Sequence, residues 1–112
     1  MMSTHEAEAG PVTLINVFEV DPEKLEAFIA SWRERAEIMR KQPGFRSLRL
    51  HRAISPDSRF QVVNVAQWES AEALNAATAQ RGWREKASRA VDQVGFAANP
   101  AIYRIAFEIN GP

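Results

Sequence analysis

The apolar pattern of the chain changes its period at Asp21-Pro22-Glu23, and this change limits the folds that the chain can adopt. Before this point, residues 12–20 alternate between two faces, as a β-strand does. After it, apolar side chains recur at helical spacing until Gln42-Pro43-Gly44 ends the pattern. Asp21 is a suitable N-cap, and Pro22 fits the first helical position. The first unit of the fold is therefore a strand that leads directly into an amphipathic helix.

The rest of the chain continues the alternation of strand and helix. The further elements that the pattern predicts are strands at residues 45–54, 60–68 and 101–109, a helical region from Ser70 to Val94 and a loop at residues 95–100. Gly82 is expected to break or bend the helical region. The order β-α-β-β-α-β is the split βαβ arrangement of ferredoxin-like folds. We predict the α+β class, with a four-stranded antiparallel sheet and helices on one face.

The size and charge of the chain exclude several kinds of function. Its 112 residues suit one domain, which we place at residues 12–109 after a flexible N-terminal leader at residues 1–11. The 14 basic and 14 acidic residues cancel, which argues against partners such as nucleic acid or an anionic membrane. The absence of cysteine excludes disulfides and thiol catalysis. Without a signal-peptide pattern or a membrane-length apolar run, the chain is expected to be cytoplasmic.

One face of the predicted strand at residues 60–68 combines an amide with an otherwise apolar row. The side chains on this face are Phe60, Val62, Asn64, Ala66 and Trp68. A buried amide costs about 1–3 kcal/mol unless it is hydrogen-bonded. The small Ala66 leaves a gap between Asn64 and Trp68 that matches the edge of a flat ligand in size and polarity. These residues are the strongest indication of a functional site.

Asn16 is predicted to lie near Asn64, because the first and third strands of a split βαβ sheet are neighbours. Both amides then project into the space between the sheet and the helices. The alternative is that each amide pairs with the backbone or with the other amide and binds no ligand. The residues alone leave these two interpretations about equally supported. Trp68 is by itself more typical of a core residue than of a catalytic one.

The other candidates for chemistry are weaker. The two histidines, His5 and His51, are far apart in the sequence and have no clustered carboxylates, so no metal site is predicted. His51 is more typical of a half-exposed strand residue than of a general base. Trp32 belongs to the apolar stripe of the first helix and is expected in the core. Trp83 either packs in the core or lines the mouth of a pocket.

The second face of the predicted sheet is too apolar to face water. It carries Ile15, Val17, Val63 and Val65 on the first and third strands. A contiguous apolar patch of this kind marks an interaction surface. We therefore predict a homodimer that packs sheet against sheet.

The residues also resemble a known family, the antibiotic biosynthesis monooxygenase domain of the dimeric α+β barrel superfamily. The resemblance covers residues 12–109 and includes the segments Val12–Val20, Gln42–Phe45 and Val63–Ala73. The trio Asn16, Asn64 and Trp68 is its most specific part. It is similar to the active-site set of cofactor-independent monooxygenases that oxidise anthrone-type intermediates of aromatic polyketides.

The resemblance implies an enzyme that converts a flat phenolic, anthrone- or quinol-type substrate to a quinone with O₂ and without a cofactor. The substrate supplies the electrons once it has lost a proton, and the protein favours the anion and positions oxygen. In this interpretation Asn16 and Asn64 hydrogen-bond the substrate oxygens, and Trp68 orients the ring system. The chain departs from some anthrone oxidisers at Leu74, where those enzymes place a tyrosine.

Three other functions are alternatives to a cofactor-independent monooxygenase. Haem-degrading relatives need a Trp and a haem-ligating His, but the corresponding positions here fall near Ala77 and Ala87, and no histidine follows His51. An RNA-recognition domain should carry a basic-Gly-aromatic signature, which residues 59–63 do not match. A non-catalytic dimeric module that binds a small ligand or acts in a stress response remains the main alternative to the enzyme.

Overall fold

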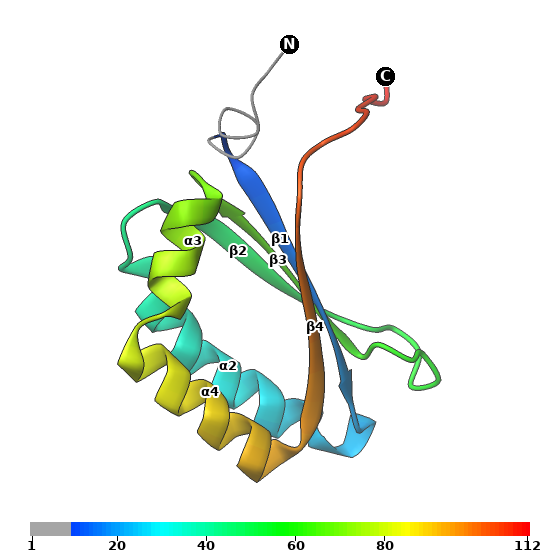
Figure 1. Cartoon of the computed structure of the whole chain (residues 1–112). Helices are drawn as coiled ribbons and strands as arrows, with labels where there is room; N and C mark the ends of the chain where they lie inside the picture. Colours follow the sequence, from blue (N-terminus) through cyan, green and yellow to red (C-terminus); the bar gives the residue numbers. More distant parts are fainter. Residues whose placement is uncertain (1–9) are drawn as a thin grey trace.

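The computed structural model describes residues 10–112, so nearly all of the predicted leader lies outside the described residues. The described chain forms a four-stranded antiparallel sheet in the order β2-β3-β1-β4, with its helices on one face (Figure 1). The elements are β1 (Val12–Val20), the short 3₁₀ helix η1 (Pro22–Lys24), α2 (Leu25–Arg40), β2 (Phe45–Arg52), β3 (Val62–Trp68), α3 (Ala71–Thr78), α4 (Arg81–Val94) and β4 (Phe96–Tyr103). This is the predicted α+β, ferredoxin-like arrangement. No helix of the described part is long and apolar enough to cross a membrane.

The register between β1 and β3 places the two predicted amides opposite each other. Asn16 pairs with Asn64, and Val12 pairs with Trp68 at the far end of the same ladder. The prediction that the first and third strands are neighbours is therefore confirmed. Cross-strand partners lie within about 4.5–5.5 Å of each other, so the register alone brings both amides to one point on the sheet.

The first helix begins as the sequence predicts, with one local difference. The side chain of Asp21 accepts a hydrogen bond of 2.9 Å from the backbone N–H of Glu23. The first turn is 3₁₀, however, and the α-helix starts at Leu25. Phe28 and Trp32 of α2 then pack on Phe18 of β1, with ring centroids 4.9 Å and 5.5 Å from that of Phe18. These aromatic contacts hold α2 against the centre of the sheet.

The second helical region is interrupted, but the break is not at Gly82. Ser70 caps α3 as predicted, because its Oγ accepts from the N–H of Ala73 at 3.1 Å. The helix then ends at Thr78, and Gln80 has an extended backbone before α4 begins. Gly82 lies in the first turn of α4, where a glycine costs helix stability without ending the helix.

The prediction for the last strand was wrong at both ends. Of the expected loop at residues 95–100, all but Gly95 belong to β4, while residues 104–109 form no strand. Pro100 is tolerated because β4 is an edge strand. Tyr103 pairs with Thr13 near the start of β1, so the chain beyond it has no strand of its own sheet to pair with. The C-terminal segment runs past the end of the sheet (Figure 1).

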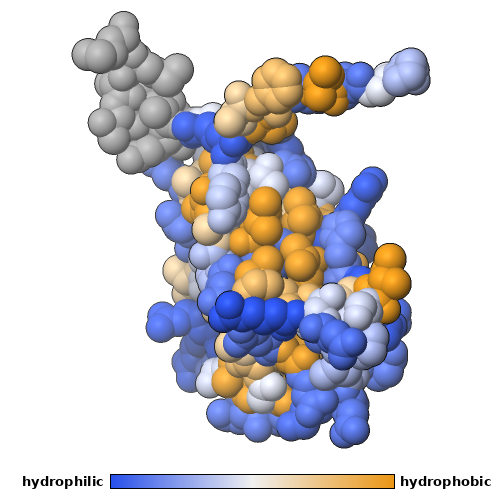
Figure 2. Space-filling view, turned by 90° about the vertical axis from the view of Figure 1, so that its right-hand side faces the viewer, coloured by the Kyte–Doolittle hydropathy of each residue, from blue (hydrophilic) through white to orange (hydrophobic). Residues whose placement is uncertain are grey.

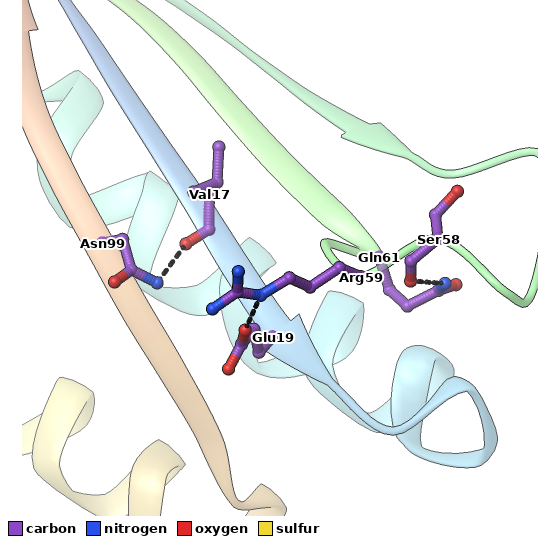
Figure 3. A network of polar contacts seen from close by, with 6 residues as sticks. All are labelled: Val17, Glu19, Ser58, Arg59, Gln61 and Asn99. Carbon is purple, nitrogen blue, oxygen red and sulfur yellow. Dashed lines mark hydrogen bonds and ion pairs between the residues drawn. The ribbon is translucent and has the colours of Figure 1, made fainter.

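The strands β2 and β3 are each two residues shorter than predicted at the loop that joins them. Gln61 is buried, and its side-chain Nε2 donates to the carbonyl oxygen of Ser58 at 2.6 Å (Figure 3). The same Nε2 also donates to the carbonyl oxygen of Ser55 at 3.1 Å. The loop therefore folds around the Gln61 amide. This keeps residues 53–60 out of the extended conformation that their apolar members favour.

Candidate active site

A cavity of about 400 Å³ lies between the sheet and the helical layer. All three predicted site residues, Asn16, Asn64 and Trp68, line it, as does the small Ala66 between the last two. The four strands and the three α-helices all contribute lining residues. The structure thus brings the predicted site residues together around one cavity that has room for a ligand.

Asn64 carries an unsatisfied polar atom in this cavity. Its position in β3 turns the side chain toward the helices, and the residue is only 2% exposed. Its Oδ1 is buried and has no hydrogen-bond partner among the described residues. Most buried polar side-chain atoms in proteins are hydrogen-bonded, so this oxygen is an exception. It is available to accept a hydrogen bond from a ligand.

Asn16 is only partly available. Its Oδ1 accepts a hydrogen bond of 3.0 Å from the backbone N–H of Asn99 in β4. In return, the side-chain Nδ2 of Asn99 donates to the carbonyl oxygen of Val17 at 3.2 Å (Figure 3). This exchange ties β4 to β1 beside Pro100, which has no N–H to give to the sheet. The alternative in which the amide pairs with the backbone therefore holds for the oxygen of Asn16. Its NH₂ group is the part that remains for a ligand.

Trp68 belongs both to the core and to the cavity wall. The residue is 1% exposed, and its ring meets Phe45 edge to face with centroids 5.3 Å apart. Phe45 lines the cavity beside it. The contact fixes the plane of the indole, so Trp68 is suited to orient a flat ring system rather than to move during a reaction.

Several lining residues were not predicted for the site. Trp32 packs in the core as expected, but it also lines the cavity, and its buried Nε1 has no hydrogen-bond partner among the described residues. Asn75 and Thr78 of α3 add to the wall. For Trp83 of α4 the sequence left open a core position or a place at a pocket, and the residue both packs against the core and lines the cavity. Leu74 and Thr78 are four residues apart and therefore lie on the same face of a helix. This spacing is the sequence signal that could have identified Thr78 as a lining residue. The β4 members of the lining could not be found, because that strand was misplaced.

The lining within the described residues has no titratable side chain. His51 is exposed and does not line this cavity; it lines a second hollow, which shares Trp32 with the first. No group of three or more His, Cys, Asp or Glu residues that could hold a metal ion occurs in the part of the chain that the structure describes. Leu74, at the position where some anthrone oxidisers have a tyrosine, presents hydrocarbon to the cavity. The polar groups at hand are thus amides, indoles and a threonine hydroxyl.

The comparisons with known proteins point to one family. The model of the family described as "Antibiotic biosynthesis monooxygenase" matches residues 11–88. A comparison with curated proteins finds no significant match. A solved structure of a candidate monooxygenase from Shewanella loihica PV-4 is 37% identical, with a TM-score of 0.72. It covers 88% of this chain and 97% of its own.

A second solved structure has a stated activity. SnoaB from Streptomyces nogalater, described as a cofactor-independent oxygenase, is 26% identical with a TM-score of 0.76. The match covers 92% of this chain and all of that one. A candidate antibiotic biosynthesis monooxygenase from Caulobacter crescentus is 15% identical with a TM-score of 0.75, which supports the fold alone.

Proposed function

The chain belongs to the antibiotic biosynthesis monooxygenase family, and on that premise we propose that it oxidises a flat phenolic, anthrone- or quinol-type molecule to a quinone with O₂ and without a cofactor. The observation that carries this proposal is the unpartnered oxygen of Asn64, buried in a cavity that is otherwise mostly apolar. The similarity to SnoaB, a cofactor-independent oxygenase, supports the reaction type.

The cavity suits such a substrate in size and in polarity. Its volume of about 400 Å³ lies within the range of small-molecule sites, roughly 300–1,000 Å³. A planar ring system fits over Ala66 with Trp68 at one end and the two amides at the other. The free NH₂ group of Asn16 donates to a substrate oxyanion, while Oδ1 of Asn64 accepts from a hydroxyl group. The two amides thus recognise a substrate that carries both kinds of oxygen.

The reaction uses electrons from the substrate. Loss of a proton from the ring CH₂ of an anthrone gives an enolate, which passes one electron to O₂. The resulting radical and superoxide combine to form a C–O bond, and the proton lost at the start returns to the peroxide. Loss of the remaining C–H proton together with cleavage of the O–O bond then releases water and leaves the quinone carbonyl. One oxygen atom of O₂ enters the product, and the other leaves as water. The protein contributes by stabilising the anion and fixing its orientation.

The test is oxygen consumption by metal-free protein with dithranol, an anthrone. Asn64→Ala and Trp68→Phe should each lower kcat by at least about 10-fold, because Asn64 holds a substrate hydroxyl group and Trp68 fixes the orientation of the ring system. Gln93→Ala removes an exposed amide of α4 and serves as the matched control, with unchanged kcat expected. Full activity in both site variants would reject this site.

A non-catalytic ligand-binding module is the second candidate. The absence of a titratable side chain in the described lining favours it, since many oxidative sites use an acid or base to move protons. This module would bind dithranol, as shown by quenching of tryptophan fluorescence, but would not raise the rate of oxygen consumption above that of dithranol in buffer. The two measurements on one sample separate the two candidates.

We also propose that the protein acts as a homodimer packed sheet against sheet. Figure 2 shows hydrophobic side chains gathered on the face of the sheet that the helices leave open. Ile15, Val17, Val63 and Val65 alternate with the buried residues of β1 and β3, and all four remain partly exposed in the single chain. The C-terminal segment adds a second exposed apolar region, with Ile105, Phe107 and Ile109. A second copy of the chain covers both regions at once.

A further inference from the structure

Arg35 is a buried cation that has no counterion in the part of the chain that the structure describes. It lies in the middle of α2 and is only 3% exposed, and it is the only charged residue among the described ones that is buried. Its Nε and Nη2 atoms have no hydrogen-bond partner, and it takes part in no ion pair within the described residues. Buried charges in proteins are normally paired. An exception of this kind calls for a reason.

The surroundings of Arg35 connect it to the cavity. The central carbon of its guanidinium lies 4.8 Å from the ring centroid of Trp32 and 5.8 Å from that of Trp83. It also lies 5.5 Å from the centroid of Phe96 and 5.9 Å from that of Phe28. Trp32 and Trp83 line the cavity on one side, whereas Arg35 does not line it. The cation therefore lies behind an indole wall of the cavity.

No acidic side chain of residues 10–112 forms an ion pair with this cation. On α2, Glu34 pairs with Lys86 of α4 at 3.8 Å. On α4, Glu85 pairs with Arg81 at 2.7 Å. In β4 the one titratable group is Tyr103, which is half exposed. An unpaired charge in a low-dielectric environment acts over longer distances than a solvated one.

We propose that Arg35 makes the cavity prefer the anionic form of a phenolic or enolic ligand, acting through the Trp32–Trp83 wall without contacting the ligand. Arg35 is in this sense a positioning residue whose contribution is electrostatic. The inference rests on the proposed function, because an oxidation that starts from an enolate gains from any group that favours that anion. It specifies the substrate class further: a flat molecule that loses a proton to become a delocalised anion.

The aromatic rings explain how the charge is kept in place. A guanidinium over the faces of Trp and Phe rings gains cation–π attraction, which holds Arg35 without a carboxylate. A carboxylate partner would have cancelled the field inside the cavity. The aromatic cage thus retains the cation and leaves its charge available to act on a ligand.

The test reads the ionisation of a bound dye and needs no turnover. Alizarin, a dihydroxyanthraquinone, changes its absorbance when it loses its first phenolic proton, so its pKa in the cavity can be titrated. We expect the pKa of alizarin bound to the wild-type protein to lie below that of the free dye. In Arg35→Met it should rise by about one unit, which is a tenfold change in the ratio of anion to neutral dye.

Two further variants make the result specific. Arg33→Met removes an exposed charge from the same helix and should leave the bound pKa at the wild-type value. Arg35→Lys keeps a positive charge, so the pKa of the bound dye should stay nearly as low as in the wild type. This variant also provides a test of the proposal if Arg35→Met does not fold. Equal pKa values in the wild type and Arg35→Met, equal effects of Arg33→Met and Arg35→Met, or a Lys variant with the pKa of the free dye would overturn the proposal.

Oxygen consumption with dithranol separates this inference from the proposed function. A wild-type protein that lowers the pKa of alizarin but consumes no oxygen contradicts the oxygenase and supports the role of Arg35. An active enzyme in which Arg35→Met leaves the pKa of the bound dye unchanged contradicts only the role of Arg35. Failure of the wild type to bind alizarin also overturns the inference, because the cavity then does not accept a flat phenolic anion.

Discussion

Asn64 and Arg35 both carry buried polar atoms that no other described residue satisfies. Such atoms cost stability, typically about 1–3 kcal/mol each for neutral groups, and folding alone gives no reason to keep them. The inward position of Asn64 follows from the two-residue period of β3, so the sequence predicts it. The burial of Arg35 does not follow, because an arginine between Trp32 and Met39 is compatible with a side chain that reaches solvent. Whether the oxygen of Asn64 has a partner also depends on neighbouring strands and could not be predicted.

Replacement of Arg35 by methionine should stabilise the fold. Burial lowers the pKa of Arg35 from its usual value to about 10, so the unfolded chain holds this proton more tightly than the folded one. The unfavourable contribution is then fully present below about pH 10 and is relieved only as the pH rises above that value. We expect Arg35→Met to raise the free energy of unfolding by about 1 kcal/mol, after the loss of the cation–π contacts.

Urea denaturation of Arg35→Met checks this sign. The gain should be the same between about pH 6 and pH 9, because Arg35 stays protonated over that range in both states. Arg33→Met is again the control and should change the free energy of unfolding by less than about 0.5 kcal/mol. A less stable Arg35→Met protein would mean that the aromatic cage more than compensates for the burial of the charge.

The elements of the sheet and the helices differ in how well the sequence predicts them. The start of α2 and the cap of α3 depend on local hydrogen bonds of Asp21 and Ser70, and local signals of this kind can be read from the sequence. The position of β4 depends on pairing with β1. Asn99 and Pro100 favour a loop, but the exchange of hydrogen bonds with Asn16 and Val17 overrides that preference. Non-local pairing therefore explains why this strand and its part of the cavity were missed.

Gly44 fixes the connection between α2 and β2 and should not tolerate a side chain. Its φ of +86° is in the left-handed region, and a Cβ built on it would lie 2.5 Å from the Cβ of Ala73. We expect Gly44→Ala to lower the free energy of unfolding by about 1–3 kcal/mol, because it combines backbone strain with a steric clash. Gly82→Ala, at a helical position with nothing within 4 Å, should raise it by about 0.5–1 kcal/mol. Urea denaturation of the two variants should show these opposite signs.

At the scale of the whole molecule, the single chain leaves apolar surface that a soluble monomer rarely exposes. Ile105, Phe107 and Ile109 are 74%, 80% and 81% exposed. They belong to the C-terminal segment, which runs away from the end of the sheet (Figure 1). The alternation of these residues led to the prediction of a strand, which the single chain does not form. Alternating apolar residues without a partner strand are expected where a second chain provides the missing contacts.

The homodimer is tested most directly at the centre of the open face of the sheet. Val63 in β3 pairs with Val17 in β1, so Val63→Glu places a carboxylate between the two proposed sheets. We expect light scattering after gel filtration to show a dimer for the wild type and a monomer for Val63→Glu. An unpaired charge buried in an interface costs several kcal/mol, which is enough to separate two copies at micromolar concentrations.

The monomer should keep its fold, because this face is open to solvent in the single chain and the helices lie on the other side. Far-ultraviolet circular dichroism and urea denaturation of Val63→Glu measure this. Val91→Glu makes the same change at an exposed position of α4 and should remain a dimer. Removal of residues 104–112 should weaken the dimer without unfolding the sheet, because no strand of β1–β4 extends beyond Tyr103. A wild-type monomer at micromolar concentrations, or a Val63→Glu dimer of unchanged affinity, would place the interface elsewhere and leave the apolar face without an explanation.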